Sequence, residues 1–170
     1  AETVLLHLLR GSGMRGLTGM AHHSPLPYQS DLTLIRPMLD VTRAQVEAYA
    51  AEHAIQARHD PSNDDTRYTR NRIRHELLPQ LADYNPQIAG ALKRLADVLR
   101  AEDDYMQAQF ERDVWQHAQV EPQRVSIARE RFKALHVAMQ RRFILRAVAH
   151  ISQNPPMVTQ EHVQATIALA

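Results

Sequence analysis

A repeating stripe of apolar residues in the middle of the chain restricts its fold more than any other feature of the sequence. The stripe recurs at steps of three, four or seven residues, the spacing that places side chains on one face of a helix. Its members are Ile88, Leu92, Leu95, Leu99, Met106, Phe110 and Val114. Asn85 followed by Pro86 is typical of a helix start, where a capping side chain precedes a first-turn proline. We therefore predict one long helix whose apolar face needs a partner.

The partner is expected further along the chain. A second apolar set with helical spacing consists of Phe132, Leu135, Met139, Phe143, Ile144 and Val148. We predict that the helix carrying this set packs against the long one, as neighbouring helices do in a bundle. A last helix is expected from about Thr159. Residues 81–170 are therefore predicted to form a helical domain.

Residues 1–80 have a mixed pattern. Residues 2–10 repeat apolar positions at helical spacing, whereas residues 11–30 have no period and are expected to form a long loop. A short apolar run at 32–35 predicts a strand. The chain opens without Met and runs directly into the first apolar repeat, which we interpret as a cut inside a helix.

Two further helices are predicted before residue 80. The capping-box pair Thr42 and Gln45 begins the first, which is expected to end near His53. The second carries Ile73 and is expected to end at Pro79, because proline breaks a helix interior. A strand followed by helices is typical of an α/β domain. The predicted fold class is therefore mostly α: residues 1–80 are the C-terminal remnant of an α/β domain, and an α-helical domain follows.

The composition excludes several kinds of chemistry. None of the 170 residues is a cysteine, which excludes disulfides, thiolate metal sites and thiol nucleophiles within them and fits a reducing, cytoplasmic setting. The ten histidines do not have convincing metal-ligand spacing beside carboxylates, so no metal site is predicted. No apolar run approaches the roughly 20 residues that a membrane helix needs, and no membrane contact is expected.

A dense polar segment from Asp60 to Arg74 is the most informative part of the sequence for function. Arg70 and Arg74 are four residues apart on a predicted helix, where like charges repel, so an acidic group is expected opposite them. Two interpretations are open. In the first, the arginines are neutralised in a surface network by Asp60, Asp64 or Asp65. In the second, the two guanidinium groups bind a phosphate. Asn63 and Asn71 in the same segment are candidates for the site or for turn and cap positions.

Two other segments carry candidate binding residues. Arg10, Gly11, Ser12 and Gly13 open a glycine-rich loop, which suits either an anion-binding loop or a helix end followed by a surface loop. A basic, predicted helical region contains Arg129, Arg131, Lys133, Arg141, Arg142 and Arg146, with Glu130 as its only acid. A solvated helix face and a contact with an RNA backbone both explain this bias.

Several of these pieces occur in an order that resembles the tRNA(Ile)-lysidine synthetases, members of the N-type ATP pyrophosphatases. The series begins with Glu2-Thr3, the tail of an Asp-Asp-x-x-Glu-Thr motif. It continues with Arg10-Gly11-Ser12-Gly13, Gly16-Leu17-x-Gly19-Met20, Arg36-Pro37-x-Leu39, Arg43, Asp60-x-Ser62-Asn63, Arg70-Asn71-x-x-Arg74 and Pro79. The resemblance is strongest over residues 1–80 and implies a Rossmann-like, adenine nucleotide α hydrolase-like domain there.

The resemblance implies an ATP-dependent ligase that joins free L-lysine to C2 of the wobble cytidine, C34, in the CAU anticodon of tRNA(Ile). The C2 oxygen is first adenylated, and the side-chain amine of lysine then displaces AMP. Lysidine pairs with A rather than G, so decoding changes from AUG to AUA. ATP and Mg²⁺ are the cofactors that the resemblance implies for an intact enzyme.

The same resemblance implies roles for individual residues. Glu2 would belong to the acidic cluster that receives the lysine ammonium group, and residues 10–13 would form a mobile loop near the active site. Arg70, Arg74, Asp60, Asn63 and Asn71 would form a polar wall near the nucleotide and the target base. Arg129, Arg131, Lys133, Arg141 and Arg142 are the candidate tRNA-binding residues.

One departure from the family pattern limits what these residues can do alone. The Ser-Gly-Gly-x-Asp-Ser phosphate loop of the family does not occur among the 170 residues, so we expect this segment by itself to bind neither cofactor and to be inactive. The apolar face of the first helix would be left exposed, and a homodimer would cover it. Alternatives are a cytidine thiolase of the same superfamily, a non-catalytic helical RNA-binding module, and a scaffold formed by residues 85–170.

Overall fold

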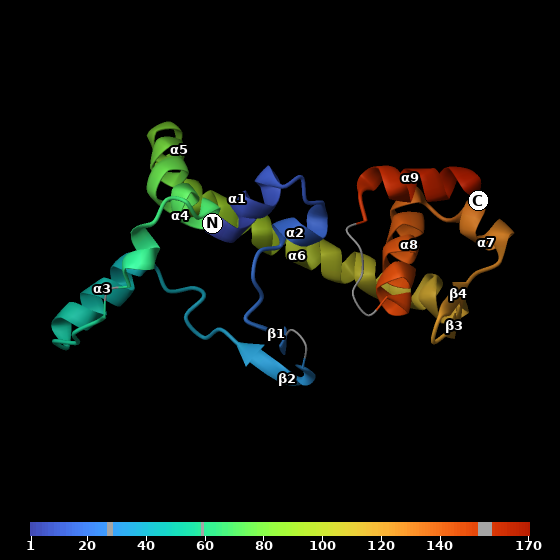
Figure 1. Ribbon diagram of the computed structural model, residues 1–170, viewed down its shortest axis with the longest axis horizontal. Helices are drawn as coiled ribbons and strands as arrows, with labels where there is room; N and C mark the ends of the chain where they lie inside the picture. The colour runs from blue at the N-terminus through green and yellow to red at the C-terminus, as the bar shows by residue number, and fades with distance from the viewer. Residues whose placement is uncertain (27–28, 59, 153–157) are drawn as a thin grey trace. The chain divides into compact units, whose positions relative to one another are not determined.

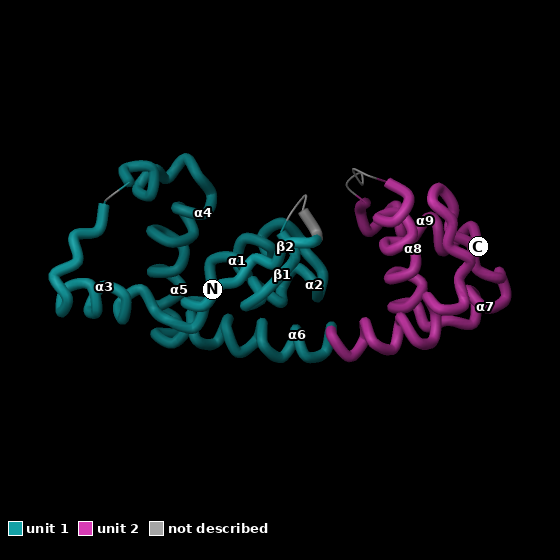
Figure 2. The backbone as a smooth tube through the Cα atoms, turned by 90° about the horizontal axis from the view of Figure 1, so that it is seen from below, with its two compact units in different colours: residues 1–103 teal, residues 104–170 magenta. Residues whose placement is uncertain are grey.

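The computed structural model describes residues 1–26, 29–58, 60–152 and 158–170, and these residues divide into two compact units (Figures 1 and 2). Unit 1 comprises residues 1–103 and unit 2 comprises residues 104–170. The boundary lies within the long helix α6 (Ile88–Asp113). Helices outnumber strands in both units, which confirms the predicted mostly α class. The division into an α/β domain up to residue 80 and a helical domain beyond it stays a prediction.

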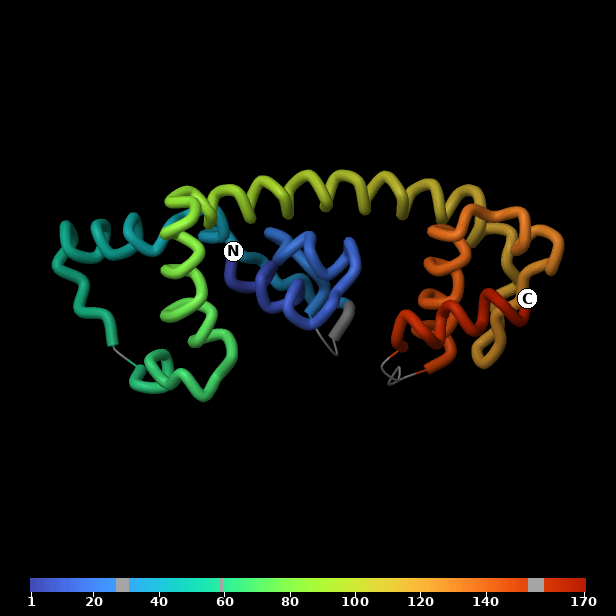
Figure 3. The backbone as a smooth tube through the Cα atoms, turned by 90° about the horizontal axis from the view of Figure 1, so that it is seen from above, coloured from blue at the N-terminus to red at the C-terminus, as the bar shows by residue number. Residues whose placement is uncertain are grey.

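Unit 1 contains the elements that position the candidate site. In chain order they are α1 (Glu2–Leu9), α2 (Met14–Leu17), β1 (His23–Leu26), β2 (Gln29–Ile35), α3 (Arg43–Glu52), the 3-10 helix η1 (Pro61–Asp64), α4 (Thr69–Arg72), the π-helix η2 (Ile73–Leu77), α5 (Leu78–Tyr84) and the first part of α6. Figure 3 shows α1 and α2 beside this part of α6. The core lies where these elements meet and contains Val4, Leu5, Ile73, Leu92 and Ala96.

Unit 2 is built around the end of α6. After it come the 3-10 helix η3 (Trp115–His117), the hairpin β3 (Gln119–Glu121) and β4 (Arg124–Ser126), and helices α7 (Arg129–Ala134), α8 (Val137–Ile151) and α9 (Gln160–Leu169). Its core contains Phe110, Val114, Phe132, Phe143, Ile144 and Val163. The Phe132 and Phe143 rings meet edge to face with their centroids 5.8 Å apart, an arrangement that aromatic quadrupoles favour.

The apolar stripe of the long helix divides between the two cores. Phe110 and Val114 pack with residues of α7 and α8, as predicted. Leu92 instead packs with α1 and η2, and Leu95 leaves 47% of its surface exposed. The prediction of one continuous face covered by one partner helix was therefore wrong. Along the 26 residues of α6, different stretches of the stripe therefore meet different partners.

Residues 11–30 are more ordered than the sequence predicted. They contain α2, and β1 pairs antiparallel with β2, so that His23 lies opposite Ile35 and Pro25 opposite Thr33. Residues 27 and 28 of the expected loop lie outside the described residues. Each strand has one partner in this two-stranded sheet, and a proline is tolerated at such an edge. The strand expected at 32–35 is confirmed as part of β2.

The helical run around Pro79 differs from the prediction. The chain stays helical from Thr69 to Tyr84, with a π-helical turn at η2 between α4 and α5. Pro79 lies in the first turn of α5, where its missing N–H costs little, instead of ending the element. The wider π turn directly before it replaces the ordinary hydrogen-bond ladder that a proline would interrupt.

The predicted capping residues lie at the start of α3 and just before the start of α6. Thr42 and Gln45 form the predicted capping box at the start of α3, which ends at Glu52 with His53 as its C-cap. The side chain of Asn85 accepts a hydrogen bond of 2.9 Å from the Gln87 N–H before α6. The basic region expected to be one helical stretch is instead α7 and α8, separated where Leu135 adopts an extended conformation. In the part of the chain that the structure describes, no helix combines the length and apolarity needed to span a bilayer.

The burial of Ile73 generates a stability prediction. Ile73 is 2% exposed in the unit 1 core, so Ile73→Ala leaves a cavity and is expected to lower the free energy of unfolding by about 2–5 kcal/mol. Ile55→Ala is the matched control, because Ile55 is 53% exposed and its truncation should change the free energy by less than about 1 kcal/mol. Urea denaturation of both variants measures the difference, and equal midpoints would contradict this core assignment.

Candidate active-site residues and a second charged network

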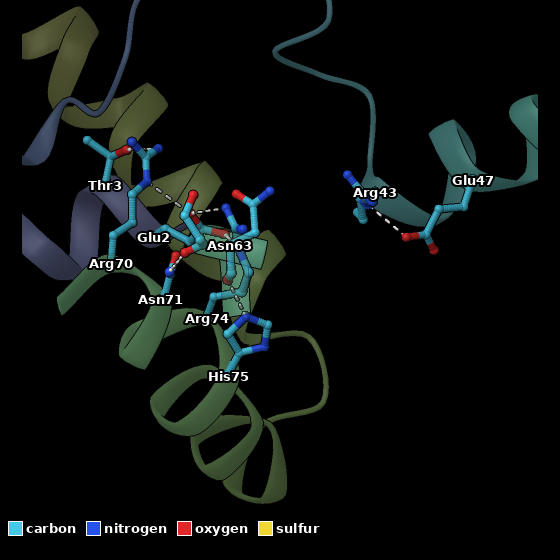
Figure 4. Close-up of polar contacts among 10 residues, drawn as sticks. Glu2, Thr3, Arg43, Glu47, Asn63, Arg70, Asn71, Arg74 and His75 are labelled. Atoms are coloured by element: carbon cyan, nitrogen blue, oxygen red, sulfur yellow. Dashed lines mark hydrogen bonds and ion pairs between the residues drawn. The ribbon is translucent and has the colours of Figure 1, made fainter. Parts of the chain in front are cut away.

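One carboxylate joins two arginines at the start of α1. Glu2 Oε1 accepts a hydrogen bond of 2.6 Å from Arg74 Nε, and Glu2 Oε2 accepts one of 3.0 Å from Arg74 Nη2. Arg70 Nε donates to Glu2 Oε2 at 3.1 Å, and Arg70 Nη2 donates to Thr3 Oγ1 at 3.4 Å. Figure 4 shows both arginines directed toward Glu2 from the neighbouring helical segment. We call Glu2, Arg70 and Arg74 the arginine cluster.

The local fold explains why these three side chains meet. Arg70 lies in α4 and Arg74 in η2, so a spacing of four residues presents both on the side that faces α1. Ile73, between them in sequence, is buried against Val4 and Leu5 of α1 and fixes the two segments against each other. The acid expected opposite the arginines is therefore Glu2, far away in sequence. Asp65 instead pairs with Arg67 at 2.7 Å.

The charge balance of the arginine cluster favours a further anion. The side chain of Glu2 is 23% exposed, while those of Arg70 and Arg74 are 51% and 42% exposed. Partial burial opposes ionisation of Glu2, but hydrogen bonds from Arg74 and Arg70 outweigh it and hold the pKa of this carboxyl below its ordinary value. The Glu2 hydrogen bonds raise the pKa of Arg74. Two cations thus share one anion, and the cluster carries one unit of positive charge.

Asn71 anchors the polar loop that precedes the arginine cluster. It is 8% exposed, and its Nδ2 donates hydrogen bonds of 2.8 Å and 2.9 Å to the main-chain oxygens of Ser62 and Asp65. Asp60 accepts from the Ser62 N–H at 2.9 Å and so caps η1. Figure 4 shows Asn63 beside His75, whose Nε2 lies 3.1 Å from the Asn63 main-chain oxygen. Asn71 and Asp60 therefore both have local structural partners, Asn71 from within α4 and Asp60 as the N-cap of η1.

Residues 10–13 lie at the opposite end of α1 from Glu2. Gly11 has a φ of +72° and its N–H donates to Leu8 O, while the Ser12 N–H donates to His7 O. This pair of hydrogen bonds is a Schellman motif, in which glycine adopts the left-handed conformation that ends a helix. Eight residues of α1, about 12 Å at 1.5 Å each, separate this cap from the arginine cluster. The hydrogen bonds of Gly11 and Ser12 stay within α1, so the two candidate segments are not joined by them.

A second charged network, which the sequence did not predict, connects α6 to the segments before and after the hairpin. Lys93 lies 3.1 Å from Asp40 and 2.9 Å from Asp97, and Asp40 lies 3.1 Å from His22. These residues and Arg100 line a pocket of about 210 Å³. The network was missed because it joins residues more than 50 positions apart, for which a sequence pattern has no short-range signal.

Arginines also hold the main chain beside this pocket. Arg100 Nη2 donates to Thr18 O at 2.6 Å and to Met20 O at 3.1 Å. Arg36 Nη1 donates to Ala21 O at 3.0 Å and to Ser24 Oγ at 3.1 Å. Gly19, between the two carbonyls that Arg100 binds, has a φ of +69° and lies close to Val4 and Ala96. Thus α6 fixes the turn that leads from the glycine-rich loop into β1.

The predicted tRNA-binding residues do not share one helix in unit 2. Arg129 donates to the main-chain oxygen of Ala170, and Arg131 and Lys133 are exposed on α7. The other two belong to α8: Arg142 donates to Gln107 Oε1 at 3.2 Å, and Arg141 is half-buried. The exposed cations on α7 therefore remain the more accessible part of this set.

Comparison with known proteins assigns the chain to a class. Residues 1–81 match the family model of the PP-loop domain, and this range contains the whole arginine cluster. The chain is 36% identical to the tRNA(Ile)-lysidine synthase of Solibacter usitatus over all of its length, which is 38% of that relative. It is 31% identical to the one from Clostridioides difficile over 99% of the chain and 36% of the relative.

A third relative matches a shorter stretch more closely. The tRNA(Ile)-lysidine synthase of Pseudomonas fluorescens is 47% identical over 100 residues, which are 59% of this chain and 22% of that protein. The chain belongs to the tRNA(Ile)-lysidine synthase family of PP-loop proteins. It spans little more than a third of the length of the relatives that it matches throughout.

Replacing Asn71 tests its anchoring role. Asn71→Ala leaves two loop carbonyls without their donor and is expected to lower the free energy of unfolding by about 1–3 kcal/mol. Asn71→Asp should cost more, because a carboxylate would then face the same two oxygens. The exposed Asn63 gives the control, and Asn63→Ala should change stability by less than about 0.5 kcal/mol. Thermal unfolding ranks the three variants; an Asn71→Asp protein as stable as wild type would refute the anchor.

The arginine cluster predicts a pH-dependent contribution to stability. Because the pKa of Glu2 is depressed in the folded state, its contribution is present above its unfolded pKa and is lost as pH falls through the folded value. Glu2→Gln should therefore lower the free energy of unfolding by about 1 kcal/mol at pH 7. The difference from wild type should shrink when urea denaturation is repeated near pH 3. A difference that stays constant between the two pH values would exclude this ionic contribution.

Proposed function

We propose that this chain is part of a tRNA(Ile)-lysidine synthase that uses ATP to join free L-lysine to C2 of the wobble cytidine C34 in the CAU anticodon. The observation that supports this most strongly is similarity to such enzymes over 99–100% of the chain, which covers both units. In this proposal residues 1–80 are the C-terminal part of a Rossmann-like PP-loop domain, and the enzyme is cytoplasmic. The expected result is a change in decoding from AUG to AUA.

The proposed reaction has two steps. The C2 oxygen of cytidine attacks the α-phosphorus of ATP, and pyrophosphate leaves. The ε-amine of lysine, once deprotonated, then forms a bond to C2, and AMP leaves with the former C2 oxygen. Adenylation is needed because a carbonyl oxygen of cytosine is a poor leaving group, whereas AMP is a good one.

The arginine cluster supplies charge that suits this chemistry. Arg70 and Arg74 bind and neutralise the phosphates, because a guanidinium fork donates paired hydrogen bonds to phosphate oxygens. Glu2 receives the ammonium group of lysine, since an ammonium offers only donors and positive charge. Mg²⁺, when bound with the triphosphate, would neutralise part of its charge. Asn71 holds the polar loop of Asp60 and Asn63 beside the arginines.

The other proposed contacts lie outside this cluster. Residues 10–13 form the loop near the substrate, and the cations of α7 and α8 contact the tRNA backbone. The 170 residues do not contain the Ser-Gly-Gly-x-Asp-Ser motif, and we expect the chain on its own to be inactive. Catalysis is therefore assigned to the full-length gene product that contains these residues.

A kinetic assay of that gene product tests the proposal. It should release AMP only when both L-lysine and a tRNA(Ile) transcript with a CAU anticodon are present, and it should attach radioactive lysine to that transcript. Arg74→Ala removes a phosphate-binding guanidinium and is expected to lower kcat about a hundredfold. Arg72→Ala is the matched control, because Arg72 lies on the same helical run but pairs with Glu76.

Each contrary result would indicate a different function or a different active site. AMP release that depends on a sulfur donor instead of lysine would identify a cytidine thiolase. Salt-sensitive tRNA binding without AMP release would identify a non-catalytic RNA-binding module. Equal losses in Arg72→Ala and Arg74→Ala would remove Arg74 from the active site.

A further inference from the structure

The arginine cluster holds its carboxylate in a nearly saturated state. Glu2 accepts three hydrogen bonds from Arg70 and Arg74, out of about four that a carboxylate can accept. By contrast, Arg43 and Glu47 on α3, also drawn in Figure 4, form a simple ion pair in which one guanidinium meets one carboxylate. Glu2, which is proposed to bind the lysine ammonium, is therefore already bound by Arg70 and Arg74, which are proposed to bind phosphate.

We propose that the arginine cluster is an exchangeable lock: a phosphate anion that binds Arg70 and Arg74 releases Glu2, and only then does Glu2 bind the ammonium of lysine. The anion and the amine therefore bind cooperatively, the anion first. This inference rests on the proposed function and adds an order of binding to it. It involves ion-pair exchange alone and no covalent step.

The net charge of the arginine cluster explains why the anion binds before the amine. Before an anion binds, the cluster carries one net positive charge, so it attracts phosphate and repels ammonium. A bound phosphate dianion changes the local charge from +1 to −1, and the sign of the interaction with ammonium reverses. Cooperativity follows even when the ion pairs to Glu2 loosen without breaking completely.

The geometry leaves the anion a route to both arginines. About half of the Arg70 side chain and 42% of the Arg74 side chain are exposed, whereas Glu2 is the most covered member at 23%. A guanidinium carries five N–H donors, and the hydrogen bonds to Glu2 use one from Arg70 and two from Arg74. An anion can therefore dock on the solvent side before Glu2 is released, which keeps the barrier to exchange low.

Linkage makes the coupling measurable from either ligand. If the anion tightens amine binding by some factor, the amine must tighten anion binding by the same factor. Isothermal titration of the full-length gene product with inorganic pyrophosphate and L-lysine measures both affinities without catalysis. Saturating pyrophosphate should tighten lysine binding at least about fivefold, the lower end of typical coupling.

Substitution of Glu2 separates the lock from simple charge attraction. Glu2→Gln keeps the shape but removes the competing charge, so pyrophosphate should bind about tenfold more tightly, equivalent to about 1.4 kcal/mol. The same variant should lose the coupling to lysine. Glu76→Gln, which removes a carboxylate paired with Arg72 on the same helical run, should change neither quantity.

Two results would overturn the lock. One is lysine binding in the wild-type protein that does not respond to pyrophosphate, and the other is a folded Glu2→Gln protein that binds pyrophosphate no more tightly. If circular dichroism shows that Glu2→Gln is unfolded, Glu2→Asp replaces it, because a shorter side chain loses reach to the arginines and should still tighten pyrophosphate binding. Absence of lysidine formation, with the coupling intact, would refute the proposed function and leave the lock standing.

Discussion

The ion pairs from Glu2 to Arg70 and Arg74 constrain how α1 meets the helical run of α4 and η2 in unit 1, because they join segments about 70 residues apart. Fixing so long a loop costs conformational entropy, and partly exposed ion pairs alone offset little of it. Ile73 adds stabilisation by burying its side chain against α1 beside the arginines. The charged contact therefore specifies which faces meet, and the apolar contact beneath it stabilises their meeting.

The sequence predicted those parts of the fold that depend on local interactions. Thr42 and Gln45 are three residues apart and form their capping box from side-chain and main-chain groups within one turn. Glu2 could not be identified as the partner of Arg74 from spacing, because a pattern shows that an acid is needed without showing which one. The hairpin of β1 and β2 was missed for a related reason: its pairing is non-local, and Pro25 masks the strand signal.

The sequence predicts which residues belong to the candidate site better than it predicts the role of each residue. The sequence allows Asn71 to be either a substrate-binding residue or a turn or cap residue, and its two hydrogen bonds to loop carbonyls show a structural role. Such a role is compatible with function, since a loop held by a buried amide keeps neighbouring polar groups in fixed positions. The Schellman cap at Gly11 similarly explains why glycine follows α1 without invoking a ligand.

The end of the PP-loop domain match does not coincide with the end of a compact structural unit. The match ends at residue 81, yet Arg100 of α6 binds the carbonyls on either side of Gly19, and Lys93 joins Asp40 to Asp97. Gly19 adopts a φ of +69°, which favours glycine, and the turn that it forms is held by the single guanidinium of Arg100. Helix α6 therefore completes the packing of the matched residues, and its first part belongs to the same compact unit, which extends to residue 103.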